Sequence, residues 1–348
     1  LMLEILEVIS TIVMFAPFLL LLFLANFADK ARTSANPKGG FGFAITSYVL
    51  ISLGYALLFL LGIVYFLLGL SEAEISGLEE FLPTEKFTSL GLAMWLPSLI
   101  GILLLIPVLR RLASRIIPID PDSRVHAVSL SLSMIILIQL FVMMSIGLDA
   151  LANMESEMDD FTTNPAPALW AQNLMFLFMS LVGVGLFIRR DFSSALRRLG
   201  IVKPTLRQVL IGIGSGLLLV GMASIIVMVG ELVGVTVDKD VEKLTEQLLG
   251  PLTQSVFGIL TMGLAAGLGE EALFRGALQP RFGLILTTIL FTLLHGNYAL
   301  TLSTFVVFLV GLALGLLRNR YNTTTAMIVH ATYNITLGVL SNLSPDLF

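Results

Sequence analysis

The sequence predicts an all-α fold, a polytopic transmembrane bundle of about ten helices. Two features of the composition lead to this prediction. Hydrophobic residues make up 56% of the 348 residues and charged residues only 13%, whereas about a quarter of the residues in a soluble domain are charged. The apolar residues also gather in stretches close to the roughly 20 residues that a helix needs to cross the hydrocarbon core. A soluble globular protein is therefore excluded.

The apolar stretches that predict spanning helices lie near residues 8–27, 42–70, 90–108, 127–152, 168–188, 207–235, 254–276, 282–297, 299–317 and 323–342. The first is long for a signal peptide and follows acidic rather than basic residues, so we expect a retained helix. The eighth is the shortest. Each of the ten is expected to cross the membrane once.

Two shorter segments between these stretches are amphipathic. Residues 191–199 place Phe192 and Leu199 on one helical face, and Gly200 follows where a helix would stop. We expect a short helix at the membrane surface here. Residues 241–249 carry a similar apolar stripe and predict a second one.

The best candidate for a domain boundary is the Pro165-Ala-Pro167 stretch. It divides the ten predicted spans into an N-terminal four-helix extension, residues 1–164, and a six-helix core, residues 165–348. No internal repeat is visible, which weakens the case for a repeat-built transporter.

Basic residues predict the orientation in the membrane. Most of the 20 lysines and arginines fall in alternate connections, such as 30–38, 110–124 and 189–207, while the intervening connections 72–85 and 155–160 are acidic. Because Lys and Arg are retained on the cytoplasmic side, this alternation predicts ten spans with both termini outside.

The composition also limits the chemistry. Cysteine is absent, so disulfides and thiolate catalysis are excluded, and any metal would need His, Glu, Asp or Asn ligands. No basic tract is interleaved with aromatic residues, so we expect no nucleic-acid partner. The apolar composition makes the lipid bilayer the expected partner.

Ionisable side chains stand within the apolar stretches near the C-terminus, where each costs several kcal/mol unless it is paired or hydrated. Glu271 and Arg275 have the i,i+4 spacing and order that favour a helical ion pair. Glu270 points about 100° away around the helix and has no local cation. It is the candidate general base.

Two further pairs complete the set. His295 stands one turn after Phe291 and can share a water molecule with Glu270. His330 and Asn334 are again spaced i,i+4 and can direct two donors toward a developing oxyanion. A carboxylate base, a water molecule and a polar clamp together predict peptide-bond hydrolysis. The structural alternative is a buried polar network that only joins helices.

In this order and spacing, the motifs EExxxR, FxxxH and HxxxN resemble those of the CAAX-protease and bacteriocin-processing family of intramembrane endopeptidases, which includes the type II CAAX prenyl proteases. The resemblance covers roughly residues 165–342. It implies that Glu270 and His295 activate water, that His330 and Asn334 form the oxyanion site, and that Glu271 and Arg275 are supporting residues.

The resemblance also implies a membrane-associated or lipidated substrate. We expect a multi-pass protein of a prokaryotic cell membrane whose site opens to the cytoplasmic side. Metal use stays open. Glu270, His295 and His330 are three ligands of the kind that zinc or another divalent metal accepts, while a glutamate-based mechanism without metal explains the same residues and is favoured because Asn334 suits an oxyanion better than zinc.

Two alternatives from other functional classes remain. A catalytically silent family member would act as a membrane scaffold or a bacteriocin-immunity protein. A proton-coupled transporter would also keep Glu and His at mid-depth, although the polar residues cluster in the last four predicted spans and leave few groups for a second gate.

Overall fold

The computed structural model describes residues 2–32, 34, 40–71, 86–151 and 164–343. These residues are almost entirely helical, and no β-strand occurs among them. The predicted all-α bundle is confirmed. The acidic connections 72–85 and 155–160, which support the predicted orientation, lie outside the described residues.

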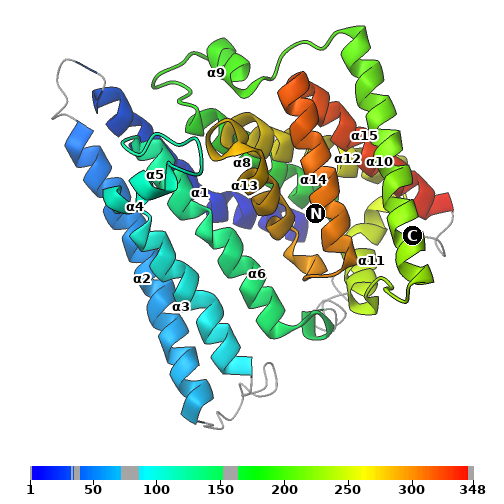
Figure 1. Ribbon diagram of the computed structural model, residues 1–348, viewed down its shortest axis with the longest axis horizontal. Helices are drawn as coiled ribbons and strands as arrows, with labels where there is room; N and C mark the ends of the chain where they lie inside the picture. The colour runs from blue at the N-terminus through cyan, green and yellow to red at the C-terminus, as the bar shows by residue number, and fades with distance from the viewer. Residues whose placement is uncertain (1, 33, 35–39, 72–85, 152–163, 344–348) are drawn as a thin grey trace.

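The N-terminal helices are α1 (Met2–Arg32), α2 (Phe41–Ser71), α3 (Phe87–Leu103), α4 (Pro107–Ala113), α5 (Arg124–Leu132) and α6 (Met134–Ile146). Helices α2 and α3 pack along each other, and α6 packs beside α3. Figure 1 shows these three as an arm at the left of the molecule.

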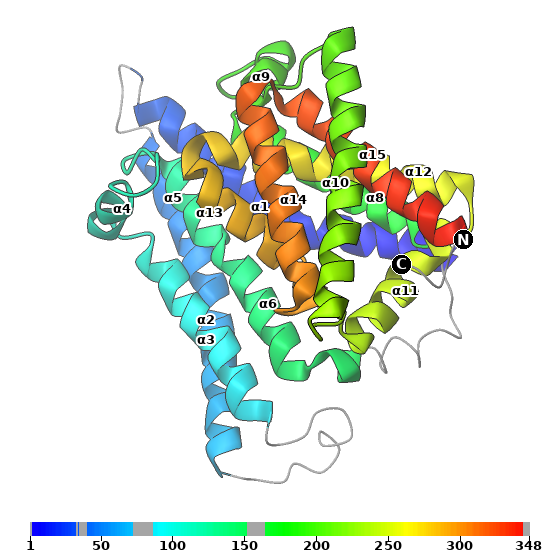
Figure 2. The same ribbon diagram turned by 45° about the vertical axis from the view of Figure 1, so that its right-hand side comes forward.

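The C-terminal elements are α8 (Ala166–Gly183), α9 (Phe192–Leu199), α10 (Leu206–Leu232), α11 (Lys239–Thr253), α12 (Val256–Glu271), the π-helix η4 (Ala272–Leu278), α13 (Gln279–Leu294), the 3₁₀ turn η5 (Gly296–Tyr298), α14 (Leu302–Arg320) and α15 (Thr323–Leu343). Helix α15 packs between α10 and α12, and α13 packs on α14. Helices α9 and α11 lie at opposite ends of this group in both views (Figures 1 and 2).

The two amphipathic segments are helices α9 and α11, as predicted. Asp191 begins α9 by accepting a hydrogen bond from the backbone N–H of Ser194, and Gly200 ends it in the left-handed conformation with φ of 75°. A side chain at Gly200 would be strained there. The carbonyl of Gly200 accepts hydrogen bonds from the N–H groups of Thr323 and Thr324, so the end of α9 is fixed to the start of α15.

All ten predicted apolar stretches are helical, but the count of ten spans is not confirmed. Within the described ranges, seven helical segments are long and apolar enough to cross a membrane, or eight if α3 and α4, which meet at a bend of 95°, form one broken span. Helix α15 is not among them. The number of spans and the orientation stay predictions.

The seventh and eighth predicted spans are not separated by a loop. Helix α12 continues through η4 into α13, from Val256 to Leu294. A straight helix of 39 residues would be about 58 Å long, well beyond the roughly 30 Å hydrocarbon core. Gly283, with φ of 78° and ψ of 171°, breaks the helical geometry and redirects α13.

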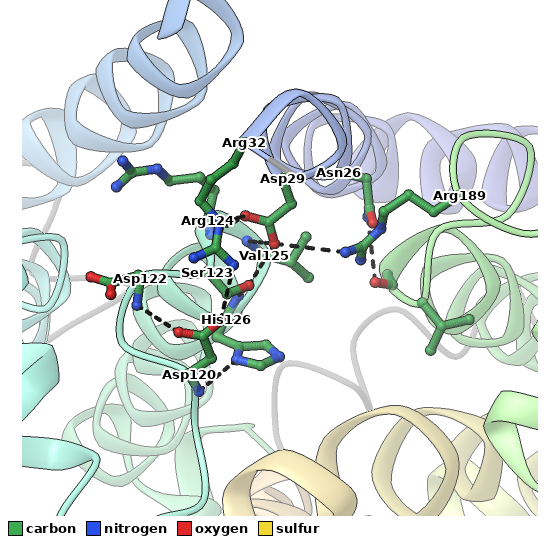
Figure 3. A network of polar contacts seen from close by, with 12 residues as sticks. Asn26, Asp29, Arg32, Asp120, Asp122, Ser123, Arg124, Val125, His126 and Arg189 are labelled. Carbon is green, nitrogen blue, oxygen red and sulfur yellow. Dashed lines mark hydrogen bonds and ion pairs between the residues drawn. The ribbon is translucent and has the colours of Figure 1, made fainter. Parts of the chain in front are cut away.

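Helix α1 is joined to α5 by a buried carboxylate (Figure 3). Oδ2 of Asp29 accepts a hydrogen bond from the hydroxyl of Ser123 at 2.6 Å, and Oδ1 accepts one from the backbone N–H of Arg124 at 2.8 Å. Asp29 therefore caps the first turn of a helix that begins 95 residues later. Helix α1 also packs against α8, so the helices before residue 164 contact those after it. A division at 164/165 stays a prediction.

Candidate active site

The packing of α12 on α15 brings the first and third motifs together. Helix α12 and the following η4 carry Glu270, Glu271 and Arg275, and α15 carries His330 and Asn334. The second motif joins them from α13, whose last turn holds Phe291 and is followed directly by His295. The contacts of these side chains define the candidate site.

Glu271 is the centre of a buried ion-pair network. Its Oε2 lies 3.2 Å from Nε of Arg275, as the i,i+4 spacing predicts. Its Oε1 lies 2.9 Å from Nδ1 of His330 on α15. Both Glu271 and Arg275 are withdrawn from solvent, and a buried charge without its partner costs several kcal/mol. The two groups therefore depend on each other.

Arg275 is held on three sides. Besides Glu271, it donates a hydrogen bond through Nη2 to the backbone carbonyl of Gly311 at 3.1 Å. Its guanidinium carbon also lies 4.1 Å from the centroid of the Phe291 ring, a cation–π contact worth about 0.5–2 kcal/mol. Arg275 thus joins η4 to α13 and α14.

Phe291 connects the two histidines. Its ring centroid lies 4.9 Å from that of His295 and 6.1 Å from that of His330, and Phe274 packs against it edge-on at 5.4 Å. Gly311 leaves room for the ring, since a Cβ there would stand 2.9 Å from Cδ1 of Phe291. The Phe291 ring is therefore held in place by its neighbours and packs against both His295 and His330.

His295 is oriented by its own helix. Its Nδ1 lies 2.9 Å from the carbonyl oxygen of Phe291. Because a carbonyl oxygen only accepts, this hydrogen bond requires a proton on Nδ1, and Nε2 of the neutral ring is then an acceptor. The His295 ring also stacks on the Tyr298 ring, with centroids 6.0 Å apart and an interplanar angle of 15°. His295 can accept a proton or a water hydrogen through Nε2.

Glu270 has no such network. Its Oε2 is buried and has no hydrogen-bond partner among the described residues. Tyr298, in the turn between α13 and α14, lies near enough that burial and the charge of Glu270 both raise the pKa of its hydroxyl. Tyr298 therefore stacks on His295 and lies within electrostatic range of Glu270. A buried polar atom without a partner marks a place where a water molecule or substrate can bind.

Asn334 contacts the backbone of the neighbouring helix. Its Nδ2 donates to the carbonyl of Met262 on α12 at 3.3 Å, while His330 contacts Glu271. The two residues of the third motif therefore do not share a partner, although the amide of Asn334 retains a second N–H.

The three candidate metal ligands do not converge. No group of three or more His, Asp or Glu side chains that could hold a metal ion occurs in the described part of the chain. Nδ1 of each histidine is hydrogen-bonded, to the carbonyl of Phe291 in one case and to Glu271 in the other, so either ring could bind a metal only through Nε2. Because the three side chains do not form a ligand group, Glu270, His295 and His330 do not fit a metal in this arrangement.

The family model described as "Type II CAAX prenyl endopeptidase Rce1-like" matches residues 252–336, which include all three motifs. This segment belongs to the CAAX-protease and bacteriocin-processing family. The resemblance found in the sequence is confirmed over this segment, which is shorter than the expected 165–342. No curated protein and no solved structure matches the chain.

Three features of the CAAX-protease segment were not predicted from the sequence. Tyr298 follows His295 by three residues but lies outside the motifs. Gly311 contributes to the site through its contacts with Arg275 and Phe291, which lie on other elements. The π-helix η4 directly follows Glu271 and contains Arg275. Such π-helical turns occur frequently at functional sites, but no residue pattern predicted this one.

Proposed function

We propose that this protein is an intramembrane endopeptidase that hydrolyses a peptide bond in a membrane-associated or lipidated protein or peptide. Two findings support the proposal. The match to type II CAAX prenyl endopeptidases covers the segment that holds the motifs, and that segment lies on long apolar helices. The clustering of basic residues in alternate connections leads us to propose a cytoplasmic opening for the site.

The observation that carries the proposal is the unpartnered oxygen of Glu270. Burial of a carboxylate oxygen without a hydrogen bond is unfavourable, so a site that keeps one is suited to bind a donor such as water. Tyr298 stacks on His295 and lies within electrostatic range of Glu270, which supports placing that water between Glu270 and His295. Nε2 of His295 would accept one of its hydrogens.

In the proposed reaction Glu270 takes a proton from the water molecule while the water oxygen attacks the carbonyl carbon of the substrate. The carbonyl oxygen becomes an oxyanion. The C–N bond then breaks, and Glu270 returns the proton to the leaving amine. The products are a new carboxyl terminus and a new amino terminus. No step is routed through a metal, since the candidate ligands do not form a ligand group.

His330 and Asn334 are proposed to stabilise the oxyanion. With both ring nitrogens protonated, His330 would donate Nδ1–H to Glu271 and direct Nε2–H at the substrate oxygen. Asn334 would contribute the amide N–H that does not bond Met262. Loss of one such donor typically lowers the rate about 100- to 1,000-fold. Glu271, Arg275 and Phe291 act by holding His330 in place.

N-terminal proteomics tests the activity. We would compare membranes from host cells that carry the wild type or Glu270→Gln at matched abundance, with Glu231→Gln as control because Glu231 is exposed and far from the motifs in sequence. New amino termini with the wild type and Glu231→Gln, but not with Glu270→Gln, are expected. Termini that persist in Glu270→Gln would contradict the assignment of the base. Identical termini in all three strains, with a phenotype on deletion, would favour the scaffold.

A further inference from the structure

Four arginines gather on the face of the molecule that carries α9. Arg190 follows α8, Arg198 lies on α9, Arg281 on α13 and Arg318 in the last turn of α14. Within the described part of the chain, none of the four guanidinium groups lies within ion-pair distance of a carboxylate. Arg190, Arg198 and Arg318 donate hydrogen bonds to neutral oxygens instead.

Each contact places an arginine against an element of the C-terminal bundle. Arg190 donates to the carbonyl of Val184 and Arg198 to that of Gly276, the latter at 3.5 Å. Oδ1 of Asn319 accepts from Arg318 at 3.4 Å and from Gln279 at 2.8 Å, which brings the end of α14 to the start of α13. That start is two residues before Arg281.

The electrostatics show that the cluster lacks a counter-charge. Burial, followed by the positive charges of Arg281, Arg190, Arg318 and Arg189, lowers the pKa of Arg198 to about 10. No carboxylate offsets these charges at Arg198. Arg198 is still charged at neutral pH, so the group of cations repels itself and favours a bound anion.

The position of α9 does not require these charges. Ala195 and Leu199 are fully buried, and the carbonyl of Gly200 binds the first N–H groups of α15. Two aromatic side chains of the same segment, Phe187 and Phe192, are 79% and 55% exposed. Exposed aromatic rings beside guanidinium groups are typical of a surface that lies among lipid headgroups.

We propose that the cluster of Arg190, Arg198, Arg281 and Arg318 is a binding site for the phosphate group of an anionic phospholipid. Guanidinium groups bind phosphate oxygens through paired N–H donors, and basic pockets between transmembrane helices bind anionic headgroups. The lipid rather than free phosphate is the expected ligand because Phe187 and Phe192 would lie among its acyl and glycerol groups.

The proposed site adjoins the catalytic motifs. Gly276, which accepts the hydrogen bond from Arg198, directly follows Arg275 in η4. The end of α9 is also fixed to α15, the helix that carries His330. A headgroup bound at Arg198 would therefore stabilise the two elements on which the Glu271 network depends.

Thermal unfolding of the purified full chain in mild detergent tests the site. Added phosphatidylglycerol should raise the unfolding temperature of the wild type, and phosphatidylcholine should not. Inorganic phosphate and glycerol phosphate form separate arms. If they stabilise the protein at concentrations as low as those of the lipid, the site is one for a soluble phosphate and the lipid assignment is wrong.

Substitutions locate the effect. In Arg198→Gln/Arg281→Gln the affinity for phosphatidylglycerol, measured by native mass spectrometry, should fall about 10- to 30-fold. Without lipid this variant should unfold at the same or a higher temperature than the wild type, because repulsion is relieved. Arg281→Gln alone, at an exposed position, should show part of the effect if the double variant does not fold. Arg115→Gln, at an exposed arginine outside the cluster, should bind normally; an equal loss there would show non-specific attraction and overturn the proposal.

Discussion

Nδ1 of His330 lies 2.9 Å from Oε1 of Glu271, although the two residues are 59 positions apart in the chain. The neighbouring Glu270 has an unpartnered buried oxygen instead. Two consecutive glutamates on one helix therefore have opposite surroundings. Oε2 of Glu271 also lacks a hydrogen bond, but it lies 3.2 Å from Nε of Arg275, whereas Oε2 of Glu270 has no such counter-charge and is available to a ligand.

Replacement by glutamine should reduce stability strongly at Glu271 and little at Glu270. Glu271→Gln should lower the free energy of unfolding by about 3–5 kcal/mol, because Arg275 becomes a buried charge without a counter-charge. Glu270→Gln should change it by less than about 1 kcal/mol, since no described hydrogen bond to Oε2 is lost. Denaturant titration in mild detergent measures both values. Equal destabilisation by the two variants would show that Glu270 also has a structural partner.

Arg275 should not be replaceable by lysine. Arg275→Lys keeps the charge, but an ammonium group cannot contact Glu271, bind the carbonyl of Gly311 and cover Phe291 at once. We expect a loss of about 1–3 kcal/mol in the free energy of unfolding. The control is Arg111→Lys, whose side chain is 65% exposed and which should change stability little. A variant as stable as the wild type would mean that charge alone is needed at position 275.

The sequence predicts those features that depend on neighbours along one helix. The Glu271–Arg275 ion pair follows from i,i+4 spacing, and α9 follows from an apolar stripe that ends at Gly200. Such interactions need no knowledge of the tertiary structure. The same rule predicts a joint role for His330 and Asn334 at an oxyanion, which stays a prediction; in the structure their side chains contact Glu271 and the carbonyl of Met262.

Features that depend on helix packing could not be predicted. His330 contacts Glu271 because α15 packs on α12. Arg275 donates a hydrogen bond to a backbone carbonyl on α14. The continuous path from α12 to α13 was missed because basic residues in an apolar stretch suggest a loop, whereas Arg275 is neutralised within the helix by Glu271. The packing of α15 on α12 leaves no sign in the local sequence, whereas the spacing of Glu271 and Arg275 did indicate that Arg275 can remain within a helix.

Gly311 should be intolerant of even a methyl group. In Gly311→Ala the new Cβ would lie 2.9 Å from Phe291, and that ring is confined by Phe274, Arg275 and both histidines. We expect Gly311→Ala to lower the free energy of unfolding by about 1–3 kcal/mol. Gly214→Ala is the matched control, since Gly214 is also within a helix but has nothing within 4 Å of the added atom. It should be neutral or slightly stabilising. If the two substitutions have the same effect, the packing around Phe291 is looser than the structure indicates.

Asp120 should give a small stability contribution that is lost in acid. Burial raises the pKa of the Asp120 carboxyl group. Hydrogen bonds from the backbone of Asp122 and from Arg32 lower it by more, so that the pKa lies below 3.8. A lowered folded-state pKa means that the contribution is complete above the unfolded-state pKa and disappears as the pH falls through the folded-state value. Because the side chain is 45% exposed, we expect less than about 1 kcal/mol.

Unfolding temperatures of the wild type and Asp120→Asn between pH 3 and pH 7 would measure this contribution. The wild type should be slightly more stable at pH 7, and the difference should shrink once the pH falls below about 4. A difference that grows on acidification would contradict the sign of the pKa change.

Asp29 should be the acidic residue most sensitive to substitution in the part of the chain before the three motifs. In Asp29→Ala, Ser123 and the backbone N–H of Arg124 would lose their acceptor in a buried place (Figure 3). Arg32 and Arg189, whose nitrogens lie 3.8 and 3.9 Å from the Asp29 carboxylate, would lose a counter-charge. Unsatisfied buried donors cost about 1–3 kcal/mol each, and loss of a helix cap costs about 1 kcal/mol.

We therefore expect Asp29→Ala to lower the free energy of unfolding by about 2–4 kcal/mol. Asp122→Ala is the control, because the Asp122 side chain is 60% exposed and its surface ion pair with Arg111 should contribute less than about 1 kcal/mol. Hydrogen exchange should also be faster at the first turn of α5 in Asp29→Ala, since the N–H of Arg124 loses its acceptor, although the hydroxyl of Ser123 still accepts from the N–H of His126. Unchanged exchange there, together with normal stability, would show that α5 is held by its apolar contacts alone and that α1 is not its anchor.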